Sequence, residues 1–320
     1  MGITTARTIT LNGIREAEQH VYEAALRTPL VRLNTDVQHG DIYLKLENLQ
    51  PIGSFKIRGT YNAVRKLGDA QLAQGVWTAS AGNAAQGVAL AAKKCGARCT
   101  VLIVDTAPAA KKDAIRGLGA QLVEASYDEF WTALQQRSYP GIEGYFVHPF
   151  DDDDVIAGNG TVALEILEDL TEVDCIIAPY GGGGLSCGIG SAIAALKPSV
   201  KVYGAEPETG APLARSFASG RAETFAEWQA SWVDGCGGKA VFPTMWPLAS
   251  KVLAGSLVSS LDQIRSALKL IAQKSHVICE GAGACAVAGG LSGSVTGTIV
   301  CVVSGGNIDL STFCELVSVP

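Results

Sequence analysis

Short apolar runs and helical segments alternate along most of this chain, and this alternation restricts its fold more than any other feature of the sequence. The pattern predicts strands at 42–46, 76–80, 99–104, 121–123, 145–147, 175–178, 200–205 and 298–303. Helices are predicted at 12–26, from 54 onward, and at 84–94, 108–118, 129–136, 158–170, 185–195, 260–274 and 282–290. Such alternation is typical of an α/β fold with a doubly wound, mostly parallel sheet.

Ligands of doubly wound sheets bind beyond the carboxyl ends of the strands, where this chain has glycine-rich turns. A chain of 320 residues suits one or two domains. We predict a small lobe at 72–148, inserted into a larger lobe that is formed by 1–71 and 149–320. The stretch 207–256 is less regular and holds three of the five tryptophans.

Charge and cysteine content narrow the possible partners and compartments. The formal net charge of -6 is spread along the chain, so no basic patch points to nucleic acid or to an anionic membrane. The nine cysteines form no C-x-x-C pair, which favours a reducing compartment over a disulfide framework or a zinc site. Residues 1–20 lack the apolar core of a secretory signal, so we expect a cytoplasmic protein.

Two segments of unusual composition invite a functional interpretation. The stretch 281–308 carries no charge, but glycines, serines and threonines divide it, so we predict a buried helix and strand rather than a membrane span. The acidic run at 151–154 is expected to be a solvated loop that leads into the next helix, with a metal site as the less favoured alternative.

Lys56 stands where a loop is expected to turn into a helix capped by Ser54. In the first turn of a helix, the positive end of the dipole disfavours an ammonium group and favours the neutral amine. A neutral amine is the form that a lysine nucleophile needs to make a Schiff base. Alternatively, Lys56 is an ordinary solvated charge at the surface. Its position therefore indicates a function only in combination with other turns of the chain.

Four consecutive glycines, Gly181, Gly182, Gly183 and Gly184, lie between an expected strand and an expected helix. Consecutive glycines let backbone N–H groups converge on one anion, and the helix N-terminus adds its dipole. Tight packing would explain one or two of these glycines but poorly explains four, so we predict a phosphate site. Cys187 stands where a dinucleotide motif needs a glycine, and the chain has no P-loop sequence. A single phosphate ester is therefore the expected ligand.

Two further turns carry polar side chains. The turn from Ser80 to Asn83 offers a hydroxyl, an amide and exposed N–H groups to a carboxylate or a ring hydroxyl, although an ordinary N-cap turn is an equal alternative. Ser304 follows a buried strand and could hydrogen-bond a ring nitrogen or simply end the strand. Combined with Lys56 and the four glycines, these turns match the needs of one cofactor, pyridoxal 5'-phosphate.

The sequence also resembles a known family, the serine/threonine dehydratases. These are pyridoxal-phosphate enzymes of fold type II, a group that includes serine racemase. The similar segments are ENLQPIGSFKIRG (47–59), SAGNAAQGVALAAK (80–93), TAPAAKKDAIRGLGA (106–120), HPFDDDDVIAGNGTVALEILE (148–168), GGGGLSCGI (181–189) and SGGNID (304–309). They cover nearly the whole chain in order. The resemblance implies that the large lobe binds the cofactor and that the small lobe binds the substrate carboxylate.

The resemblance also implies a role for each predicted site residue. Lys56 would form a Schiff base with the cofactor and then act as the base at the substrate Cα, while Phe55 would pack against the pyridine ring. Asn83 would hold the ring hydroxyl, the four glycines the phosphate, and Ser304 the pyridine nitrogen. An uncharged partner for that nitrogen suits β-elimination. The substrate carboxylate would bind Ser80, Asn83 and Ala84.

The chain departs from the family pattern at several positions. Ala84 replaces the histidine of many dehydratases, which enlarges the expected pocket. Ala81 replaces the second serine of serine racemase, so racemisation should be weak. Of the family's divalent-cation site, Glu206 and Gly210 match, but Pro212 replaces the second carboxylate, so no metal is expected.

We therefore predict a cytoplasmic, homodimeric dehydratase that converts a β-hydroxy amino acid such as threonine or serine to a 2-oxo acid and ammonia. A bulkier or acidic substrate, such as 3-phenylserine or 3-hydroxyaspartate, is an alternative because of Ala84 and the tryptophans Trp228 and Trp232, whose rings could instead belong to the core. A β-replacement enzyme and a catalytically silent amino-acid sensor are two further hypotheses for this chain.

Overall fold

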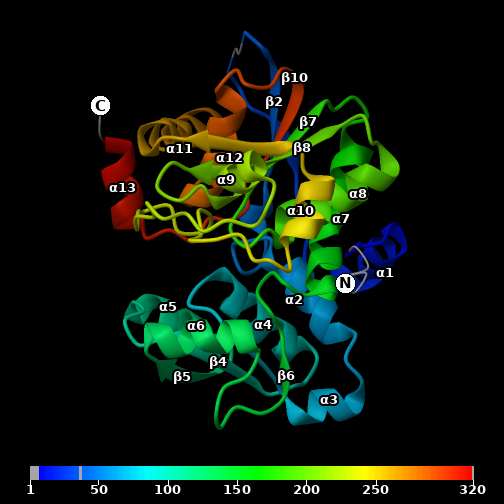
Figure 1. The fold of residues 1–320 in the computed structure, drawn as a ribbon, viewed down its shortest axis with the longest axis vertical. Coiled ribbons are helices and arrows are strands. Elements are labelled where there is room, and N and C mark those ends of the chain that lie inside the picture. Colours follow the sequence, from blue (N-terminus) through cyan, green and yellow to red (C-terminus); the bar gives the residue numbers. More distant parts are fainter. Residues whose placement is uncertain (1–6, 36–37, 319–320) are drawn as a thin grey trace.

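The fold consists of two sheets covered by helices, one sheet above the other in Figure 1. A computed structural model describes residues 7–35 and 38–318. The larger sheet has the order β1-β2-β10-β7-β8-β9, and the smaller has β5-β4-β3-β6. Every named strand pair is parallel except β1 with β2. The strands are β1 (Leu30–Arg32), β2 (Gly40–Lys45), β3 (Val76–Ala79), β4 (Cys99–Val104), β5 (Gln121–Ala125), β6 (Tyr145–Phe146), β7 (Cys175–Pro179), β8 (Lys201–Pro207), β9 (Gly255–Ser259) and β10 (Gly297–Val302).

Helices connect these strands and confirm the predicted α/β alternation. The helices are α1 (Leu11–Val21), η1 (Glu47–Leu49), α2 (Lys56–Arg65), α3 (Asp69–Gln74), α4 (Asn83–Lys94), α5 (Ala109–Gly117), α6 (Tyr127–Gln136), α7 (Asp153–Asp169), α8 (Gly184–Leu196), α9 (Pro212–Ser219), α10 (Trp246–Val252), α11 (Leu261–Ser275), α12 (Gly281–Leu291) and α13 (Leu310–Ser318). Ser260 and Gln263 form a capping box at the start of α11.

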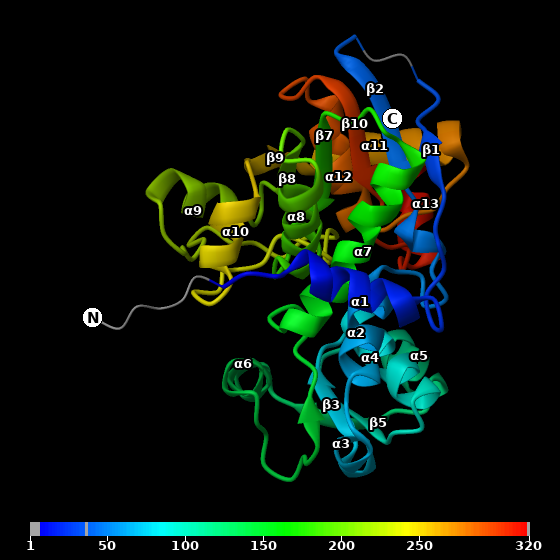
Figure 2. The same cartoon turned by 90° about the vertical axis from the view of Figure 1, so that its right-hand side faces the viewer.

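The larger sheet is buried on both faces, as expected for a parallel sheet. Successive residues of β10 point to opposite sides. Ile299 and Cys301 pack with α11 and α12, whereas Val300 and Val302 pack with α7 and α8. Figure 2 shows these helix layers on either side of the strands.

The smaller sheet is built by one continuous part of the chain. Val101 and Ile103 of β4 pack with α2, α4 and α5, and Leu102 packs with α6 on the other face. The strands of this sheet all fall within the predicted small lobe at 72–148. The assignment of that lobe and of 1–71 with 149–320 as separate domains stays a prediction.

The acidic run at 151–154 differs from its prediction. Helix α7 begins at Asp153 rather than at 158, because a side-chain oxygen of Asp152 accepts the N–H groups of Asp154 and Val155 at 2.9 and 3.0 Å and caps the helix. The expected solvated loop is wrong for Asp151 and Asp152, which are buried. Asp151 is paired with Arg7 and Arg137 and accepts a hydrogen bond from Thr244.

The less regular stretch at 207–256 contains α9 and α10, and β9 begins at its end; we predicted none of these elements. Strand β9 shows no alternation of exposed and buried residues that a sequence pattern would reveal. The charge-free stretch at 281–308 contains the buried helix α12 and strand β10, as predicted. No helix within the described residues is long and apolar enough to span a membrane.

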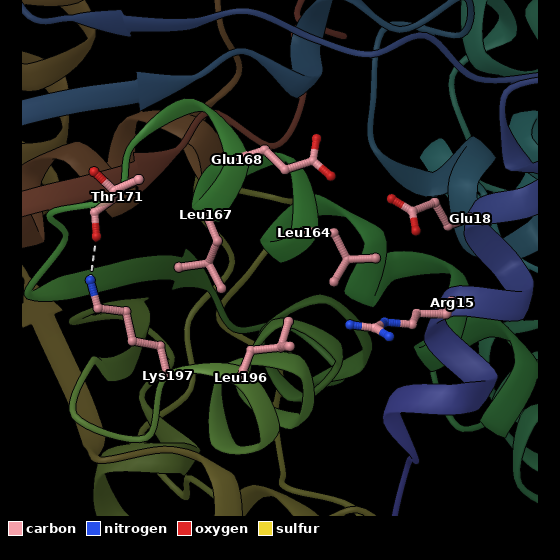
Figure 3. A pocket seen from close by; sticks show the side chains of 8 residues that line it. All are labelled: Arg15, Glu18, Leu164, Leu167, Glu168, Thr171, Leu196 and Lys197. Atoms are coloured by element: carbon pink, nitrogen blue, oxygen red, sulfur yellow. Dashed lines mark hydrogen bonds between the residues drawn. The ribbon is translucent and has the colours of Figure 1, made fainter.

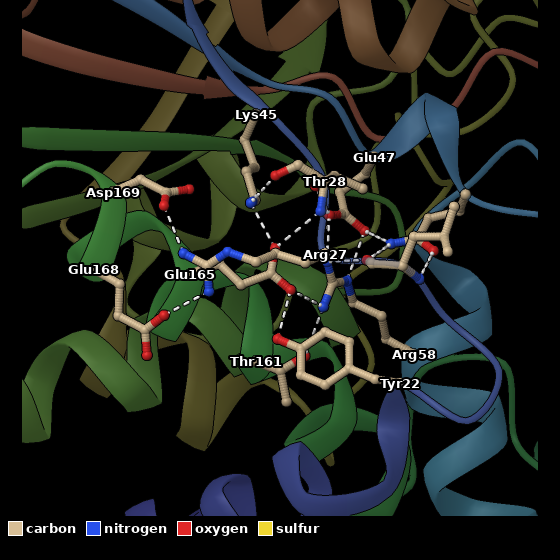
Figure 4. Close-up of polar contacts among 12 residues, drawn as sticks. Tyr22, Arg27, Thr28, Lys45, Glu47, Arg58, Thr161, Glu165, Glu168 and Asp169 are labelled. Atoms are coloured by element: carbon tan, nitrogen blue, oxygen red, sulfur yellow. Dashed lines mark hydrogen bonds and ion pairs between the residues drawn. The ribbon is translucent and has the colours of Figure 1, made fainter.

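Four fully buried charged side chains hold α2 against β2, η1 and α7 (Figure 4). The Arg58 guanidinium donates two hydrogen bonds to Glu47 and one to Glu165, each at 2.7 Å. Lys45 Nζ lies 2.5 Å from the other carboxylate oxygen of Glu165. The network is electrically balanced, and hydroxyl groups of Tyr22 and Thr28 donate to its carboxylates.

We predict that Arg58→Met strongly destabilises the fold. Removal of the guanidinium leaves two carboxylates buried with a single ammonium, and breaking such a pair costs about 3–5 kcal/mol. The free energy of unfolding, measured in urea, should fall by that amount. Arg27→Met is the matched control, because Arg27 pairs with Glu168 and Asp169 at the surface and should cost at most about 1 kcal/mol. Equal losses in the two variants would contradict this account.

Candidate active site

Helix α2 begins at Lys56, but Ser54 does not cap it as predicted. Phe55 occupies the N-cap position, and no side chain caps the helix. The Phe55 N–H instead donates to the Ser304 carbonyl at 3.0 Å, and Ser54 forms an isolated β-bridge with Gly305. The turn at 304–305 therefore fixes the start of α2 through tertiary contacts, which a local capping pattern does not reveal.

A cavity of about 550 Å³ lies at this junction, between the carboxyl ends of strands from both sheets. It is lined by members of all the predicted turns, and it also includes Phe150, Asp234 and Glu280, which we did not predict. The predicted residues that line it are Phe55, Lys56, Ser80, Asn83, Ala84, Gly182 and Ser304. The fold thus brings together groups that are far apart in the sequence.

Lys56 is half-buried at the wall of this cavity. Its Nζ donates to the Pro149 carbonyl at 2.7 Å and lies 5.2 Å from the centre of the Phe55 ring. Burial lowers the pKa of Lys56 to about 8, with the negative charge of Glu280 acting in the opposite direction. A substantial fraction of this amine is therefore neutral near physiological pH.

Glu280 is a buried carboxyl group in the same cavity. Asn83 Nδ2 donates to its Oε1 at 2.9 Å, and Asn307 Nδ2 donates to Asn83 Oδ1 at 2.7 Å. Burial and, to a smaller extent, the charge of Asp234 raise the pKa of Glu280 to about 8. The donor hydrogen that remains on Asn83 Nδ2 is free for another acceptor.

Two glycines make room for this carboxyl group. A Cβ atom added at Gly305 would lie 2.4 Å from Glu280 Oε1, and one added at Gly235 would lie 3.1 Å from it. Sequence reasoning missed Glu280, because an acid before a helix is usually a capping residue. Here its side chain makes no cap hydrogen bond, although it occupies the N-cap of α12.

The four predicted glycines form the turn from β7 into the N-terminus of α8. Gly183 has φ +91°, which favours glycine, and the Phe150 ring packs so closely on Gly182 that an added Cβ would lie 2.1 Å from it. Gly184 also lies against the Phe150 backbone. Close packing therefore explains more of these glycines than we expected, while Gly182 still faces the cavity.

The residues that matched a cation site lie outside this cavity. The Glu206 carboxylate accepts hydrogen bonds from the N–H groups of Leu213 and Ala214 and from the Ser256 hydroxyl, at 2.7–2.9 Å. Burial raises the pKa of Glu206 to about 7. Gly210 donates its N–H to the Pro207 carbonyl. Within the described residues, no group of three or more His, Cys, Asp or Glu side chains could hold a metal ion.

The two tryptophans considered for the substrate pocket have different surroundings. Trp228 lines a second cavity next to the first, and its Nε1 donates to the Gly237 carbonyl at 3.0 Å. Trp232 packs against the core beside Gly281. Only Trp228 is therefore placed to contact a ligand.

Figure 3 shows a separate hollow of about 620 Å³ between α1 and the C-terminal ends of α7 and α8. Its polar side chains include Arg15, Glu18 and Glu168, and Lys197 donates to the Thr171 carbonyl at its edge. It contains none of the predicted site residues.

Comparison with known families shows the family to which this chain belongs. A family described as pyridoxal-phosphate dependent enzyme matches residues 21–305. The chain belongs to this family. A catabolic L-threonine dehydratase of Staphylococcus aureus (strain N315) is 38% identical over 319 residues, which cover 97% of this chain and 92% of that protein.

Solved structures agree with this membership and confirm the prediction of fold type II. Maize serine racemase superposes with a TM-score of 0.90 at 31% identity, covering 97% of each chain. The processed form of threonine deaminase isoform 2 from Solanum lycopersicum has a TM-score of 0.86 at 30% identity, covering 98% of this chain and 96% of that one.

The residues of the first cavity fit pyridoxal 5'-phosphate. A buried lysine amine with a lowered pKa lies at its wall, and a glycine turn at the N-terminus of a helix of 13 residues offers N–H groups and a dipole to a phosphate. Asn83 and Ser304 supply uncharged hydrogen-bonding groups to the same space.

We predict that Lys56 in the cofactor-free protein reacts with an amine-selective acylating reagent with a midpoint near pH 8, because its pKa is lowered to about 8. Ordinary exposed lysines have a pKa of about 10.4 and react with a correspondingly higher midpoint. Peptide mass spectrometry across pH 6–11 measures each lysine separately. If Lys56 reacts with the same pH midpoint as most other lysines, burial does not lower its pKa.

We predict that Glu280 makes the fold lose stability as the pH rises. Its pKa is raised from 4.5 to about 8 in the fold, so the stability is fully present below pH 4.5 and is lost as the pH rises to about 8. In wild type, this effect lowers the free energy of unfolding by roughly 4 kcal/mol between pH 5 and 9. Glu280→Gln cannot ionise at this position, so the variant should lack this loss. Urea unfolding of the cofactor-free protein measures it. Glu172→Gln, at an exposed position, is the control, and an unchanged pH dependence in Glu280→Gln would refute the assignment.

Proposed function

We propose that this protein is a pyridoxal-phosphate-dependent ammonia-lyase that removes water from a β-hydroxy amino acid of the threonine or serine type. The enamine that remains is hydrolysed, and the products are a 2-oxo acid and ammonia. The observation that carries the proposal is the meeting of Lys56, the Ser80–Asn83 turn and Gly182 around one cavity. The similarity to a threonine dehydratase and to a threonine deaminase supports the same reaction.

The cofactor would be held at several points. Lys56 would hold it covalently through Nζ, with Phe55 against its ring, and Ser304 would accept or donate a hydrogen bond at the ring nitrogen. The remaining hydrogen of Asn83 Nδ2 suits the ring hydroxyl. Its phosphate would lie against Gly181, Gly182, Gly183 and Gly184. When bound, pyridoxal 5'-phosphate supplies an electron sink for the negative charge that develops at the substrate Cα.

The chain itself supplies a base and a binding site for the substrate. Lys56, once released as a free amine, takes the Cα proton at Nζ, and a pKa near 8 keeps a useful fraction of it unprotonated. The Pro149 carbonyl, 2.7 Å from Nζ, orients the amine and then stabilises the ammonium that forms. Ser80, Asn83 and the N–H of Ala84, at the start of α4, would bind the substrate carboxylate.

The position next to Ser80 favours elimination over racemisation. Ala81 lines the cavity and has no group that could return a proton to the Cα atom. A racemase needs such a group on the face opposite to its lysine. Loss of the β-hydroxyl therefore becomes the productive outcome once Lys56 has taken the proton.

We further propose that the enzyme acts in the cytoplasm as a homodimer. All nine cysteines are free thiols, which suits a reducing compartment. The dimer rests on the family resemblance, and light scattering of the purified protein would measure it. Likewise, 72–148 as the substrate-carboxylate domain and the rest as the cofactor domain are parts of this proposal.

We expect Lys56→Ala to abolish 2-oxo acid release from L-threonine and L-serine and to lose the visible absorbance of the bound cofactor. Lys66→Ala is the control, because Lys66 lies at the end of the same helix and pairs with Asp154 at the surface. Full activity in Lys56→Ala would refute the assignment. A wild-type protein that binds threonine without releasing product would instead favour a sensor or a replacement enzyme.

A further inference from the structure

A second cavity of about 480 Å³ adjoins the first and shares with it the wall formed by Phe150, Gly182, Asp234 and Gly235. The Ser80–Ala84 turn lines the first cavity but does not line the second. A substrate whose carboxylate lies on that turn would reach the second cavity by extending its side chain past Gly182. Gly181 and Gly182, of the proposed phosphate turn, form the boundary.

Aromatic rings follow one another along this second cavity. The ring centres of Phe150 and Phe242 are 4.9 Å apart, those of Phe242 and Trp131 are 5.8 Å apart, and those of Trp131 and Tyr127 are 6.4 Å apart with nearly parallel planes. The row begins on Gly182, because the Phe150 ring packs directly on that residue. Its spacing and tilts are those that aromatic rings prefer among themselves.

A lysine side chain contacts aromatic rings on two opposite walls of the second cavity. Lys239 Nζ lies 4.7 Å from the centre of the Tyr127 ring, which comes from α6, and 4.6 Å from the centre of the Trp228 ring. The Trp228 indole is held in turn by its hydrogen bond to Gly237. These contacts keep an aromatic ring on each side of the cavity, one from the small-sheet helix α6 and one from the 225–242 segment.

We propose that the second cavity binds an aryl group on the β-carbon of the substrate, so that the preferred substrates are aryl-substituted β-hydroxy amino acids such as 3-phenylserine. The inference rests on the proposed function and specifies its substrate class. The methyl group of threonine would leave this space almost empty, whereas a phenyl ring would contact Phe150, Trp131 and Trp228.

An anionic side chain is the competing occupant, since Lys239 could pair with a carboxylate. The geometry favours the aryl group for two reasons. The ammonium is already in contact with two ring faces, and five aromatic side chains line the cavity together with the carboxylate of Asp234, which would repel an anion. An aryl ligand would add a further ring to the row without drawing the ammonium away from its contacts.

Binding of compounds that cannot react tests this directly. L-Phenylalanine and L-2-aminobutyrate both lack the β-hydroxyl group, so neither can be dehydrated. Titration of the cofactor-loaded enzyme, followed by tryptophan fluorescence and by cofactor absorbance, should show L-phenylalanine binding at least about tenfold more tightly. Equal or weaker binding of L-phenylalanine would overturn the inference, whatever the enzyme does with threonine.

A larger side chain at Gly238 would fill part of the second cavity. It lines the second cavity, its backbone is not in a left-handed conformation, and an added Cβ would have no neighbour closer than 3.7 Å. Gly238→Leu should lower the ratio of turnover of 3-phenylserine to that of threonine by about tenfold or more, with Gly238→Ala in between. Gly117→Leu, on the exposed face of α5, is the control and should leave the ratio unchanged. An unchanged ratio in Gly238→Leu would contradict the inference.

The remaining outcomes separate this inference from the proposed function. Turnover of threonine together with no turnover of 3-phenylserine would overturn the inference and leave the proposed function standing. No turnover of either compound would refute the proposed function, while the L-phenylalanine titration would still decide on the aryl site. Preference for 3-hydroxyaspartate, lost in Lys239→Gln, would show that the cavity binds an anion and that the inference is wrong.

Discussion

The position of α2 depends on the buried network of Lys45, Glu47, Arg58 and Glu165. Its members come from β2, η1, α2 and α7, so it joins four segments at one point inside the protein. Charged groups are costly to bury, and this set is tolerated because each carboxylate meets a cation and further hydrogen bonds. Arg58 lies two residues after Lys56 along the same helix. The network therefore holds the nucleophile's helix while staying out of the cavity itself.

Burial acts on two ionisable groups of the cavity, Lys56 and Glu280, in opposite directions. It lowers the pKa of Lys56 to about 8 and raises that of Glu280 to about 8. Both shifts favour the uncharged form, because each group has lost much of its contact with water. Lys111, Asp234 and Asp309 line the same cavity, so charged groups of both signs remain there beside Lys56 and Glu280.

Much of the fold and part of the site could be predicted from sequence. Strand β10 and helix α12 were predictable because their apolar residues form uninterrupted runs. Ser54 was misassigned because the contact that fixes α2 comes from Ser304, which is distant in the chain. Glu280 was missed because its side chain is placed by room left at Gly235 and Gly305. The aromatic row was missed because its rings come from separate segments of the chain and meet only in the folded protein.

The smaller sheet is joined to the larger one by two stretches of chain, α2 on the way in and the segment that leads from β6 to α7 on the way out. Both stretches meet at the nucleophile, because Lys56 opens α2 and bonds the carbonyl of Pro149. Any rotation of the smaller sheet about these connections would have its axis close to Lys56. Such a rotation would change the gap between Tyr127 of α6 and Lys239 across the second cavity, while the reacting amine stayed nearly still.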